Sequence, residues 1–378
     1  MGFAMSSLIN CTGHRAVLPP ITSAYREILF DADGNRYFDL EAGVWCLSLG
    51  HNHENIEALL AERRNCLLHS GYIYTADVVE TAASRVCAFA GIPEGACLFL
   101  SSGSEAIEFA LQVVGEIGQG GKVVTLPKAY FGSYSRTNQR DGRWLELPWS
   151  MDDFRDGHRE IPQRPAAFLF EPGSASGEVR FPDASYVRFL AEEIQSKGGL
   201  VVANEITTGA GRTGANCCYE HYGIRPDIVV MGKGIGNGFP VSAIVVNKDI
   251  AMELEASPFK YMQSHQNDPL SAMIALCVIE TIETEGLAAK ASEKGRALLD
   301  LLKPLEKIDS VRQVRGRGLM LAIEFNSKDV CARVHSELVG SGFVTTNRGV
   351  MIRIDPPLNV DPDTLDRFAT RLAELSRS

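Results

Sequence analysis

The sequence lacks the features that mark several common protein classes. Basic residues do not exceed acidic ones, because 37 Lys and Arg stand against 47 Asp and Glu, for a net charge of -10. A surface that follows nucleic-acid phosphates needs a Lys/Arg excess, so we expect small solutes as ligands and no nucleic acid. No apolar run reaches the roughly 18 residues of a membrane span. The N-terminus also lacks a basic segment followed by an apolar one. We therefore expect neither membrane spanning nor export.

Cysteine spacings typical of disulfide frameworks or metal sites are missing as well. The nine cysteines are an odd number, without a C-x-x-C pair or a Cys/His metal pattern. We expect reduced, mostly buried thiols in a cytoplasmic protein, and no metal site. Repeats, low-complexity tracts and Pro/Ser-rich linkers are absent too, so any domains should be tightly joined.

What the middle of the chain does contain is an alternation of short apolar runs and amphipathic helical segments. In one such segment, residues 184–197, Val187, Leu190 and Ile194 fall on one helical face. Strands that alternate with helices predict an α/β fold with a mostly parallel sheet covered on both faces. The apolar runs are residues 96–103, 121–127, 166–173, 199–205, 227–234 and 241–247.

The pattern changes after about residue 268. Two long helical segments, about 269–285 and 287–306, lead to strand-like runs and a closing helix, which predicts a smaller α+β domain. The first 50 residues contain a predicted hairpin that turns at Asp33-Gly34. We expect three parts: an N-terminal segment (1–50) that packs with the small domain, a large domain (51–267) and the small domain itself (268–378).

Polar residues follow several of the predicted strands, where ligands of an open parallel sheet collect. Glu171, Asn204 and Lys233 each come at the end of an apolar run. Gly103 and Ser104 begin a helix, whose first N–H groups can hold a phosphate, although Ser there can also be an ordinary N-cap. A partly buried Lys233 amine can form a Schiff base with a carbonyl, and the alternative is a solvated surface lysine.

The stretch GAGRTG, residues 209–214, has the G-x-G-x-x-G spacing of a dinucleotide-binding turn. Such a turn needs its first glycine close to the strand and a helix directly after the third glycine. Here residues 204–208 intervene, and the segment 215–226 before the next strand is too short and ends in proline. The glycine spacing therefore does not indicate a nicotinamide cofactor.

Taken together, these motifs resemble the class III aminotransferases of the ω-amino-acid and acetylornithine type, which are pyridoxal-phosphate enzymes of fold type I. The resemblance runs over LFDADGNRYFDLEAGVWCLSLGHNH, SSGSEAIEFAL, EPGSASGE, NEITTGAGRTG, PDIVVMGKGIGNGFPVSA, VRGRGLMLAIEF and MIRIDPPL. It implies pyridoxal 5′-phosphate as the cofactor, a large domain with a mostly parallel sheet, a smaller α+β domain, and a homodimer with shared active sites.

The resemblance also implies a role for each matching position. Lys233 matches the lysine that holds the cofactor as a Schiff base and moves a proton between Cα and C4′. Arg353 matches an arginine that binds a substrate carboxylate, and Trp45 is a candidate for the same pocket or for the core. Ser264 matches a threonine that reaches the cofactor phosphate of the partner subunit. The other implied cofactor-binding residues are Gly103, Ser104, Tyr130 (stacked on the ring), Glu171, Asn204, Ile206 and Thr207.

Three positions depart from the family pattern. The family usually has an aspartate where this chain has Asn204, and the aspartate keeps the pyridine nitrogen protonated. An amide can hydrogen-bond that nitrogen but supplies no negative charge, so we expect a weaker electron sink. Thr207 stands where a glutamine is common, and Phe131 replaces a histidine. The stretch 130–171, which helps to shape the substrate pocket, is condensed.

We expect an aminotransferase that moves an amino group between an amino acid or ω-amine and a 2-oxo acid. Asn204 leaves open a second function on the same fold, namely elimination, replacement, racemisation or cyclisation. A non-catalytic, cofactor-binding subunit is a third alternative.

Several further polar residues are expected to have no role in the chemistry. Asp39 and Glu41 are expected to be solvated or hairpin residues. Loop or packing roles are expected for three histidines, while His265 lies nearer the expected site without a clear role; the three are His51, His53 and His69.

Overall fold

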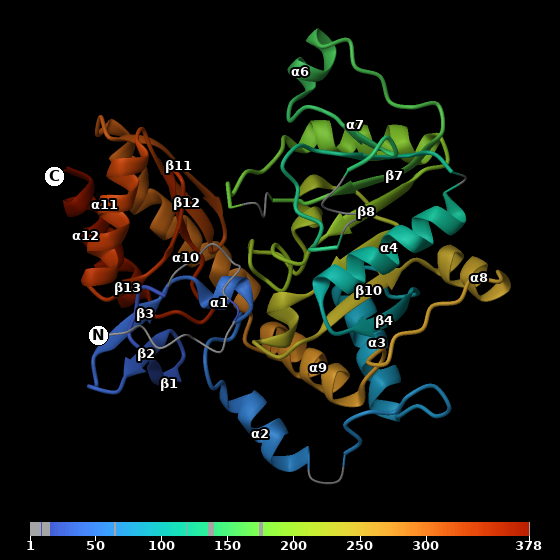
Figure 1. The fold of residues 1–378 in the computed structure, drawn as a ribbon, viewed down its shortest axis with the longest axis horizontal. Coiled ribbons are helices and arrows are strands. Elements are labelled where there is room, and N and C mark those ends of the chain that lie inside the picture. Colours follow the sequence, from blue (N-terminus) through green and yellow to red (C-terminus); the bar gives the residue numbers. More distant parts are fainter. Residues whose placement is uncertain are drawn as a thin grey trace.

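The computed structural model describes residue 9 and residues 16–63, 66–118, 120–134, 140–173 and 177–377. Residues 1–8 and 10–15 of the predicted N-terminal segment lie outside this part, as do residues 135–139 of the condensed stretch. In Figure 1 a large sheet with its helices lies beside a smaller body, and the blue N-terminal strands lie next to that smaller body. None of the described helices has the length and apolar character needed to cross a bilayer.

The large sheet has seven strands, and it is mostly parallel. Five neighbouring strands, from β9 to β6, run parallel, whereas β10 is antiparallel to both of its neighbours. The predicted α/β fold class is confirmed. In spatial order the strands are β4 (Ala96–Leu100), β10 (Ser242–Val246), β9 (Ile228–Met231), β8 (Leu200–Asn204), β7 (Pro165–Phe170), β5 (Lys122–Thr125) and β6 (Trp144–Glu146).

Helices cover both faces of this sheet. Successive residues of a strand point to opposite faces, and in these strands both sets of side chains are apolar, so each face packs against helices. Along β7, Phe168 and Phe170 join the core that contains α7, whereas Ala167 and Leu169 join the core that contains α4. Apolar residues on both faces explain why the strand reads as a continuous apolar run. The helices of this part are α2 (Glu54–Glu62), α3 (Asp77–Phe89), α4 (Gly103–Ile117), α6 (Met151–Asp156), α7 (Ala184–Ser196), α8 (Lys248–Ala256), η2 (Cys218–Tyr222) and η3 (Lys233–Gly236).

The N-terminal residues form the predicted hairpin and pair with the C-terminal part. The Asp31 carboxylate accepts hydrogen bonds from the N–H groups of Asp33 (3.0 Å) and Asn35 (2.9 Å) and so closes the turn. Phe38 then pairs with Phe343 in a parallel bridge, with 5.5 Å between ring centroids. The elements are β1 (Ile21–Tyr25), β2 (Ile28–Asp31), β3 (Arg36–Asp39) and the short turn α1 (Ala42–Trp45).

The C-terminal part contains a four-stranded sheet, in the order β11-β12-β15-β14, with helices packed against it. Its first helix, α9, also packs against α3 and η3, so it contacts the large sheet's helices. The division of the chain at residues 50 and 267 stays a proposal. The elements are α9 (Pro269–Thr284), α10 (Leu287–Leu302), η4 (Lys303–Lys307), β11 (Val311–Arg317), β12 (Met320–Phe325), α11 (Lys328–Gly340), β13 (Phe343–Val344), β14 (Thr346–Arg348), β15 (Met351–Ile354) and α12 (Pro362–Arg377).

Glu205 follows β8 and places a carboxylate in the core. It is 1% exposed, and it accepts hydrogen bonds from the Thr208 hydroxyl (2.6 Å) and the Tyr219 N–H (2.7 Å). Burial raises the pKa of Glu205 from 4.5 to about 7, although these hydrogen bonds act in the opposite direction. Between pH 4.5 and about pH 7, Glu205 is therefore protonated in the folded protein and ionised in the unfolded chain.

Replacement of Glu205 by Gln should remove a pH dependence of stability. The contribution of Glu205 is fully present below pH 4.5 and is lost as the pH rises through about 7. Because one pKa unit corresponds to about 1.36 kcal/mol, the wild-type free energy of unfolding should fall by on the order of 3 kcal/mol relative to Glu205→Gln over this range. Urea unfolding at pH 5 and pH 8 measures it, with the exposed Glu192→Gln as control. Equal pH slopes in wild type and Glu205→Gln would contradict the assignment.

Candidate active site

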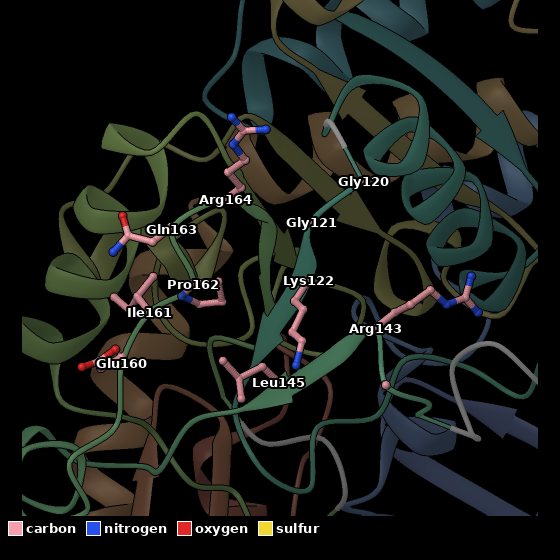
Figure 2. A pocket seen from close by; sticks show the side chains of 11 residues that line it. Gly120, Gly121, Lys122, Arg143, Leu145, Glu160, Ile161, Pro162, Gln163 and Arg164 are labelled. Atoms are coloured by element: carbon pink, nitrogen blue, oxygen red, sulfur yellow. The ribbon is translucent and has the colours of Figure 1, made fainter.

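The hollow drawn in Figure 2, of about 700 Å³, does not contain the residues expected to carry chemistry. It lies where β5 and β7 begin, and residues 120–122 and 160–164 line it together with Arg143. Ligands of an open parallel sheet collect at the opposite edge, where the strands end. That edge carries Glu171, Asn204 and Lys233.

Lys233 follows β9 and has an unusual backbone conformation. Its φ of 44° is in the left-handed region, which non-glycine residues seldom adopt outside constrained sites. Burial lowers the pKa of the amine, and the Arg353 guanidinium lowers it further, while Cys46 and Glu171 act in the opposite direction. The Nζ atom lies 5.9 Å from the centroid of the Trp45 ring. The amine thus faces an aromatic ring within a largely enclosed site.

Trp45 and Arg353, the two residues expected at the substrate pocket, contact each other. The guanidinium carbon of Arg353, on β15, lies 3.9 Å from the centroid of the Trp45 ring, a close cation–π contact. Two carboxylates flank this cation, with Nη2 3.9 Å from Glu41 Oε1 and Nε 3.7 Å from Asp355 Oδ2. Arg353 is 3% exposed, and burial lowers its pKa.

A left-handed turn places Trp45. All four residues of α1 have positive φ, with 48° at Ala42 and 66° at Trp45. Each such non-glycine residue costs roughly 1–2 kcal/mol, so surrounding contacts must hold the turn. The Asp39 carboxylate does so by accepting the N–H groups of Glu41 (3.0 Å) and Ala42 (2.9 Å). Asp39 ends the hairpin strand β3, as expected for a hairpin residue, but the alternative of a solvated residue is wrong, because Asp39 is 4% exposed and closes this turn.

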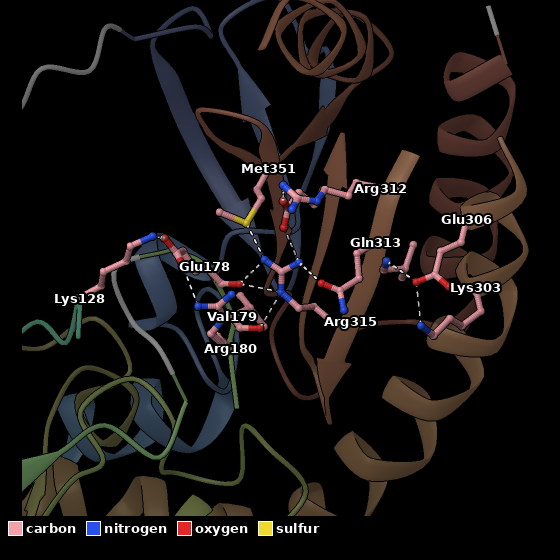
Figure 3. A network of polar contacts seen from close by, with 12 residues as sticks. Lys128, Glu178, Val179, Arg180, Lys303, Glu306, Arg312, Gln313, Arg315 and Met351 are labelled. Carbon is pink, nitrogen blue, oxygen red and sulfur yellow. Dashed lines mark hydrogen bonds and ion pairs between the residues drawn. The ribbon is translucent and has the colours of Figure 1, made fainter. Parts of the chain in front are cut away.

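The loop after β7 also packs against Trp45. Val179 packs with Trp45, Met320 and Ala322 in a small buried cluster. Arg315 of β11 fastens the loop, since its Nη2 and Nε donate to the Glu178 carbonyl at 2.7 and 2.9 Å. Figure 3 shows this Arg315 network, which also includes the ion pair between Lys128 and Glu178. The large sheet's loop, the small sheet and the N-terminal turn therefore meet at Trp45.

Asn204 is joined to Tyr130 and Glu171 by a chain of hydrogen bonds. Its amide oxygen accepts the Ile206 N–H (3.3 Å), and its Nδ2 donates to the Tyr130 carbonyl (3.1 Å). The Tyr130 N–H donates in turn to Glu171 Oε2 at 2.9 Å. Asn204 is 2% exposed, and a flipped amide would lose both hydrogen bonds. The orientation of the amide is thereby determined.

The start of α4 provides a cup of backbone N–H groups. Ser102 and Glu105 form a capping box, and the Ser104 hydroxyl accepts the Ser133 N–H at 3.1 Å. A Cβ at Gly103 would lie 2.7 Å from Ile206 Cδ1, so this turn packs closely on the Ile206 side chain, which would have to shift to admit a larger residue. Gly103, Ser104 and Ile206 are thus brought together at one edge of the sheet.

One expected position, Ser264, and one residue that departs from the family pattern, Phe131, lie apart from this arrangement. Ser264 is in an exposed loop, which Gln263 ties to Glu105 of α4 by a hydrogen bond of 2.9 Å. Phe131, which replaces a family histidine, is 1% exposed and stacks on Trp144 at 5.6 Å. The Phe131 ring therefore packs in the core beside α4 and does not face the site.

The sequence did not indicate two buried charged residues near this site, Asp355 beside Arg353 and Arg212, whose charge acts on Asp355. It also did not indicate the contact of Glu41 with Arg353. Asp355 and Arg212 are each 1% exposed. Burial raises the pKa of Asp355 to about 6, while the Arg353 and Arg212 guanidiniums oppose the shift. An aspartate two residues after an arginine in an apolar strand is a signal that could have indicated this buried pair. Arg212 lies within the glycine-rich stretch at residues 209–214.

Comparisons with known proteins agree on one family. The family model described as aminotransferase class-III matches residues 11–143 and 144–375. An acetylornithine aminotransferase of Methanocaldococcus jannaschii is 27% identical, with 92% of this chain and 90% of that protein covered. An alanine–glyoxylate aminotransferase of Pongo abelii is 26% identical, with 85% and 74% covered.

Solved structures share the fold over almost the whole chain. The ornithine aminotransferase of Toxoplasma gondii, at 25% identity, has a TM-score of 0.86 and covers 97% of this chain and 92% of its own. An amine transaminase of an uncultivated Pseudomonas species, in a PLP-bound form, has a TM-score of 0.89 at 24% identity and covers 99% and 98%.

Replacement of Asn204 by Asp should destabilise the cofactor-free protein. The Tyr130 carbonyl would lose its donor and face a carboxylate, a loss of about 1–3 kcal/mol for a buried group. The loss should shrink at low pH, because a protonated aspartate can again donate to that carbonyl. Urea unfolding at pH 5 and pH 8 measures it. The control is Asn52→Asp, since exposed Asn52 also donates to a carbonyl, that of Ala24 at 2.8 Å. Equal effects of both substitutions would contradict the role given to Asn204.

Proposed function

The chain belongs to the class III aminotransferases, pyridoxal-phosphate enzymes that transfer amino groups, and we propose that Lys233 is the lysine that holds the cofactor. The observation that carries this proposal is the position of its amine. The amine follows a parallel strand, faces Trp45 at 5.9 Å, and has a pKa lowered by burial. An enclosed amine with a lowered pKa is a better nucleophile than a solvated lysine.

The residues present fit pyridoxal phosphate. The N–H groups at the start of α4 suit a phosphate. The Ile206 side chain lies beside both Gly103 of this cup and Gly232, the residue before Lys233, because a Cβ built at either glycine would contact it. Thr207 Oγ1 is buried without a hydrogen-bond partner among the described residues, which suits a contact with a ring oxygen. Tyr130 is 44% exposed although its backbone N–H and carbonyl are both hydrogen-bonded, so its ring is available for stacking. We propose that these residues, with Gly103, Ser104 and Glu171, bind the cofactor.

The chemistry divides between the cofactor and the chain. When bound, pyridoxal phosphate supplies a carbonyl that condenses with amines and a ring that accepts the electron pair left at the substrate Cα. Lys233, once its amine is free, would take the proton from the substrate Cα and deliver it to C4′ of the cofactor. Asn204 offers an amide N–H or carbonyl lone pair to the ring nitrogen without a negative charge. We expect the ring to be a weaker electron sink than one paired with a carboxylate.

We propose an amino acid or ω-amine as the donor and a 2-oxo acid as the acceptor. Arg353 is suited to bind the acceptor carboxylate through its guanidinium, with Trp45 beneath it. The pair with Glu41 partly neutralises this cation before substrate binds, since Glu41 Oε1 is 3.9 Å away and also accepts the Thr346 hydroxyl. A donor without a carboxylate can leave that pair intact, whereas an oxo acid must compete with Glu41.

We also propose a homodimer with shared active sites. Ser264 is exposed in its loop, as a residue that serves the partner subunit must be. In the segment before α3, large apolar side chains face the solvent. Ile73 is 96% exposed, and Tyr72 and Tyr74 are more than half exposed. Contiguous exposed apolar side chains are typical of protein interfaces. The cytoplasmic location expected from the sequence stays a prediction.

Replacement of Lys233 by Ala should abolish covalent attachment of the cofactor. After borohydride reduction and denaturation, the wild-type chain should retain the cofactor on the peptide that contains Lys233. The Lys233→Ala chain should release it, and transamination should be lost. Mass analysis of the digested peptides is the measurement, and exposed Lys248→Ala is the matched control. A reduced adduct on another lysine of the wild-type chain would refute the assignment.

Replacement of Arg353 by Lys should weaken binding of the oxo acid selectively. Lysine keeps the charge beside Asp355 but lacks the planar fork that binds a carboxylate at two points. Hydrogen bonds to charged groups contribute about 1.5–3 kcal/mol, so KM for the oxo acid should rise on the order of 10- to 100-fold. KM for an amine without a carboxylate should change little.

The opposite change is expected from Glu41→Gln, which removes the competing charge and keeps an acceptor for Thr346. Because Glu41 is partly exposed and its contact with Arg353 is long, at 3.9 Å, we expect the pair to contribute on the order of 1 kcal/mol, so KM for the oxo acid should fall by roughly 2- to 5-fold. Steady-state kinetics with both kinds of substrate separate the two effects. Equal changes in KM for the amine and the oxo acid in Arg353→Lys would remove Arg353 from this role.

A further inference from the structure

Two histidines without an assigned role meet at one aspartate. His69 Nδ1 lies 2.5 Å from Asp268 Oδ1, and His265 Nδ1 lies 2.7 Å from Asp268 Oδ2. The centroids of the two imidazole rings are 5.3 Å apart. One nitrogen of each histidine and one oxygen of the aspartate lie within 4.8 Å of one another. Asp268 is 199 residues from His69, so the spacing of residues in the sequence gave no hint of the group.

The position of Asp268 in its helix makes this arrangement unusual. Asp268 is the N-cap of α9, where an aspartate normally accepts N–H groups of the first helical turn. Its side chain makes no such capping bond, and Pro269 supplies no N–H at the first position. Both oxygens are directed instead to the imidazoles. The Asp268 carboxylate therefore serves the two histidines and not its own helix.

We propose that His69, His265 and Asp268 bind a divalent transition-metal ion, with Zn²⁺ as the best match. Two imidazole nitrogens and one carboxylate oxygen are ligands that Zn²⁺ takes, and three protein ligands leave a position for water. The Asp268 side chain is 10% exposed, whereas those of His69 and His265 are 49% and 62% exposed. The carboxylate is thus held in place, while the imidazoles line the side of the group that is open in the single chain.

The distances require only small movements. Zn–N and Zn–O bonds of about 2.0–2.2 Å in a tetrahedron place neighbouring ligand atoms about 3.3 Å apart. The two hydrogen-bonded contacts must lengthen by less than about 1 Å, and the two nitrogens must approach each other if they start near the 4.8 Å limit. Rotation of two largely exposed imidazoles supplies this change without backbone movement. On binding, each Nδ1 must be free of its proton, so each histidine carries it on Nε2 or releases it to solvent.

A bound ion would connect two separate segments of the chain. His69 lies in the segment before α3, and His265 directly follows Ser264 in the loop before α9. The ion would hold this loop against the segment that contains His69. Metal binding should therefore raise the thermal stability of the protein, because the ligands come together only in the folded state.

The test uses the cofactor-loaded protein after treatment with a chelator, with Co²⁺ as a spectroscopic probe. The wild type should bind one Co²⁺ per chain, with visible absorption bands typical of four-coordinate cobalt, and Zn²⁺ should displace it. Since even an outer partner of a ligand contributes about 10- to 100-fold to metal affinity, loss of a direct ligand should weaken binding at least about 10-fold. His69→Asn and His265→Asn are the two test variants.

His158→Asn is the matched control. His158 is exposed, and its φ of 47° is one that asparagine tolerates. This variant should bind Co²⁺ as the wild type does, and Zn²⁺ should raise the Tm of these two proteins only. Asp268→Asn, which preserves side-chain shape, should lose binding as well and serves as the second variant if a histidine variant folds poorly. Absorbance of the bound cofactor and circular dichroism establish folding.

Three results would overturn the proposal. One is a wild-type protein that binds no Co²⁺ under these conditions. Another is equal Co²⁺ affinity in the wild type, His69→Asn and His265→Asn, which would place the ion elsewhere, for example on the cofactor. The third is equal loss of binding in His158→Asn, which would indicate weak association with surface histidines in general.

Discussion

The site depends on the contact between Trp45 and Arg353. The indole comes from the N-terminal segment and the guanidinium from the small C-terminal sheet, and the 3.9 Å contact joins them beside the Lys233 amine. Trp45 needs a left-handed turn, which Asp39 closes, and Arg353 is a buried cation that needs Asp355 behind it. The strain and the buried charge are both concentrated where the three parts of the chain meet.

Burial controls the charges around this contact. Arg353 lies between Asp355, which is fully enclosed, and Glu41, which is partly exposed. The inner carboxylate compensates the desolvation of the cation, and the outer one can be replaced by a ligand of the same charge. Removal of either partner from such a buried pair is more damaging than replacement of both, because an uncompensated charge remains. A carboxylate that enters the pocket can take over the role of Glu41.

The sequence predicted the sheet better than it predicted the site. Apolar runs and helical periodicity locate β7, β8, β9 and α7 closely, because burial on both faces leaves a continuous apolar signal. The positions of Lys233, Asn204 and Glu171 at strand ends follow from the same pattern. The burial of Asp39 could not be predicted, because it depends on the left-handed turn at residues 42–45. Similarly, His69 and His265 meet only through packing of segments that are distant in sequence.

At the end of β8, the adjacent residues Asn204 and Glu205 have different surroundings, which favour an amide at position 204. Glu205, the residue after β8, enters the core, where the Thr208 hydroxyl and the Tyr219 N–H donate hydrogen bonds to it. Asn204 faces the other way and meets the carbonyl of Tyr130 at 3.1 Å. A carboxylate at this position would oppose that carbonyl, whereas an amide satisfies it and keeps a second N–H. The asparagine at position 204 is therefore matched to the Tyr130 carbonyl. An aspartate at this position, which would place a negative charge near the cofactor ring, would require the segment that carries Tyr130 to move.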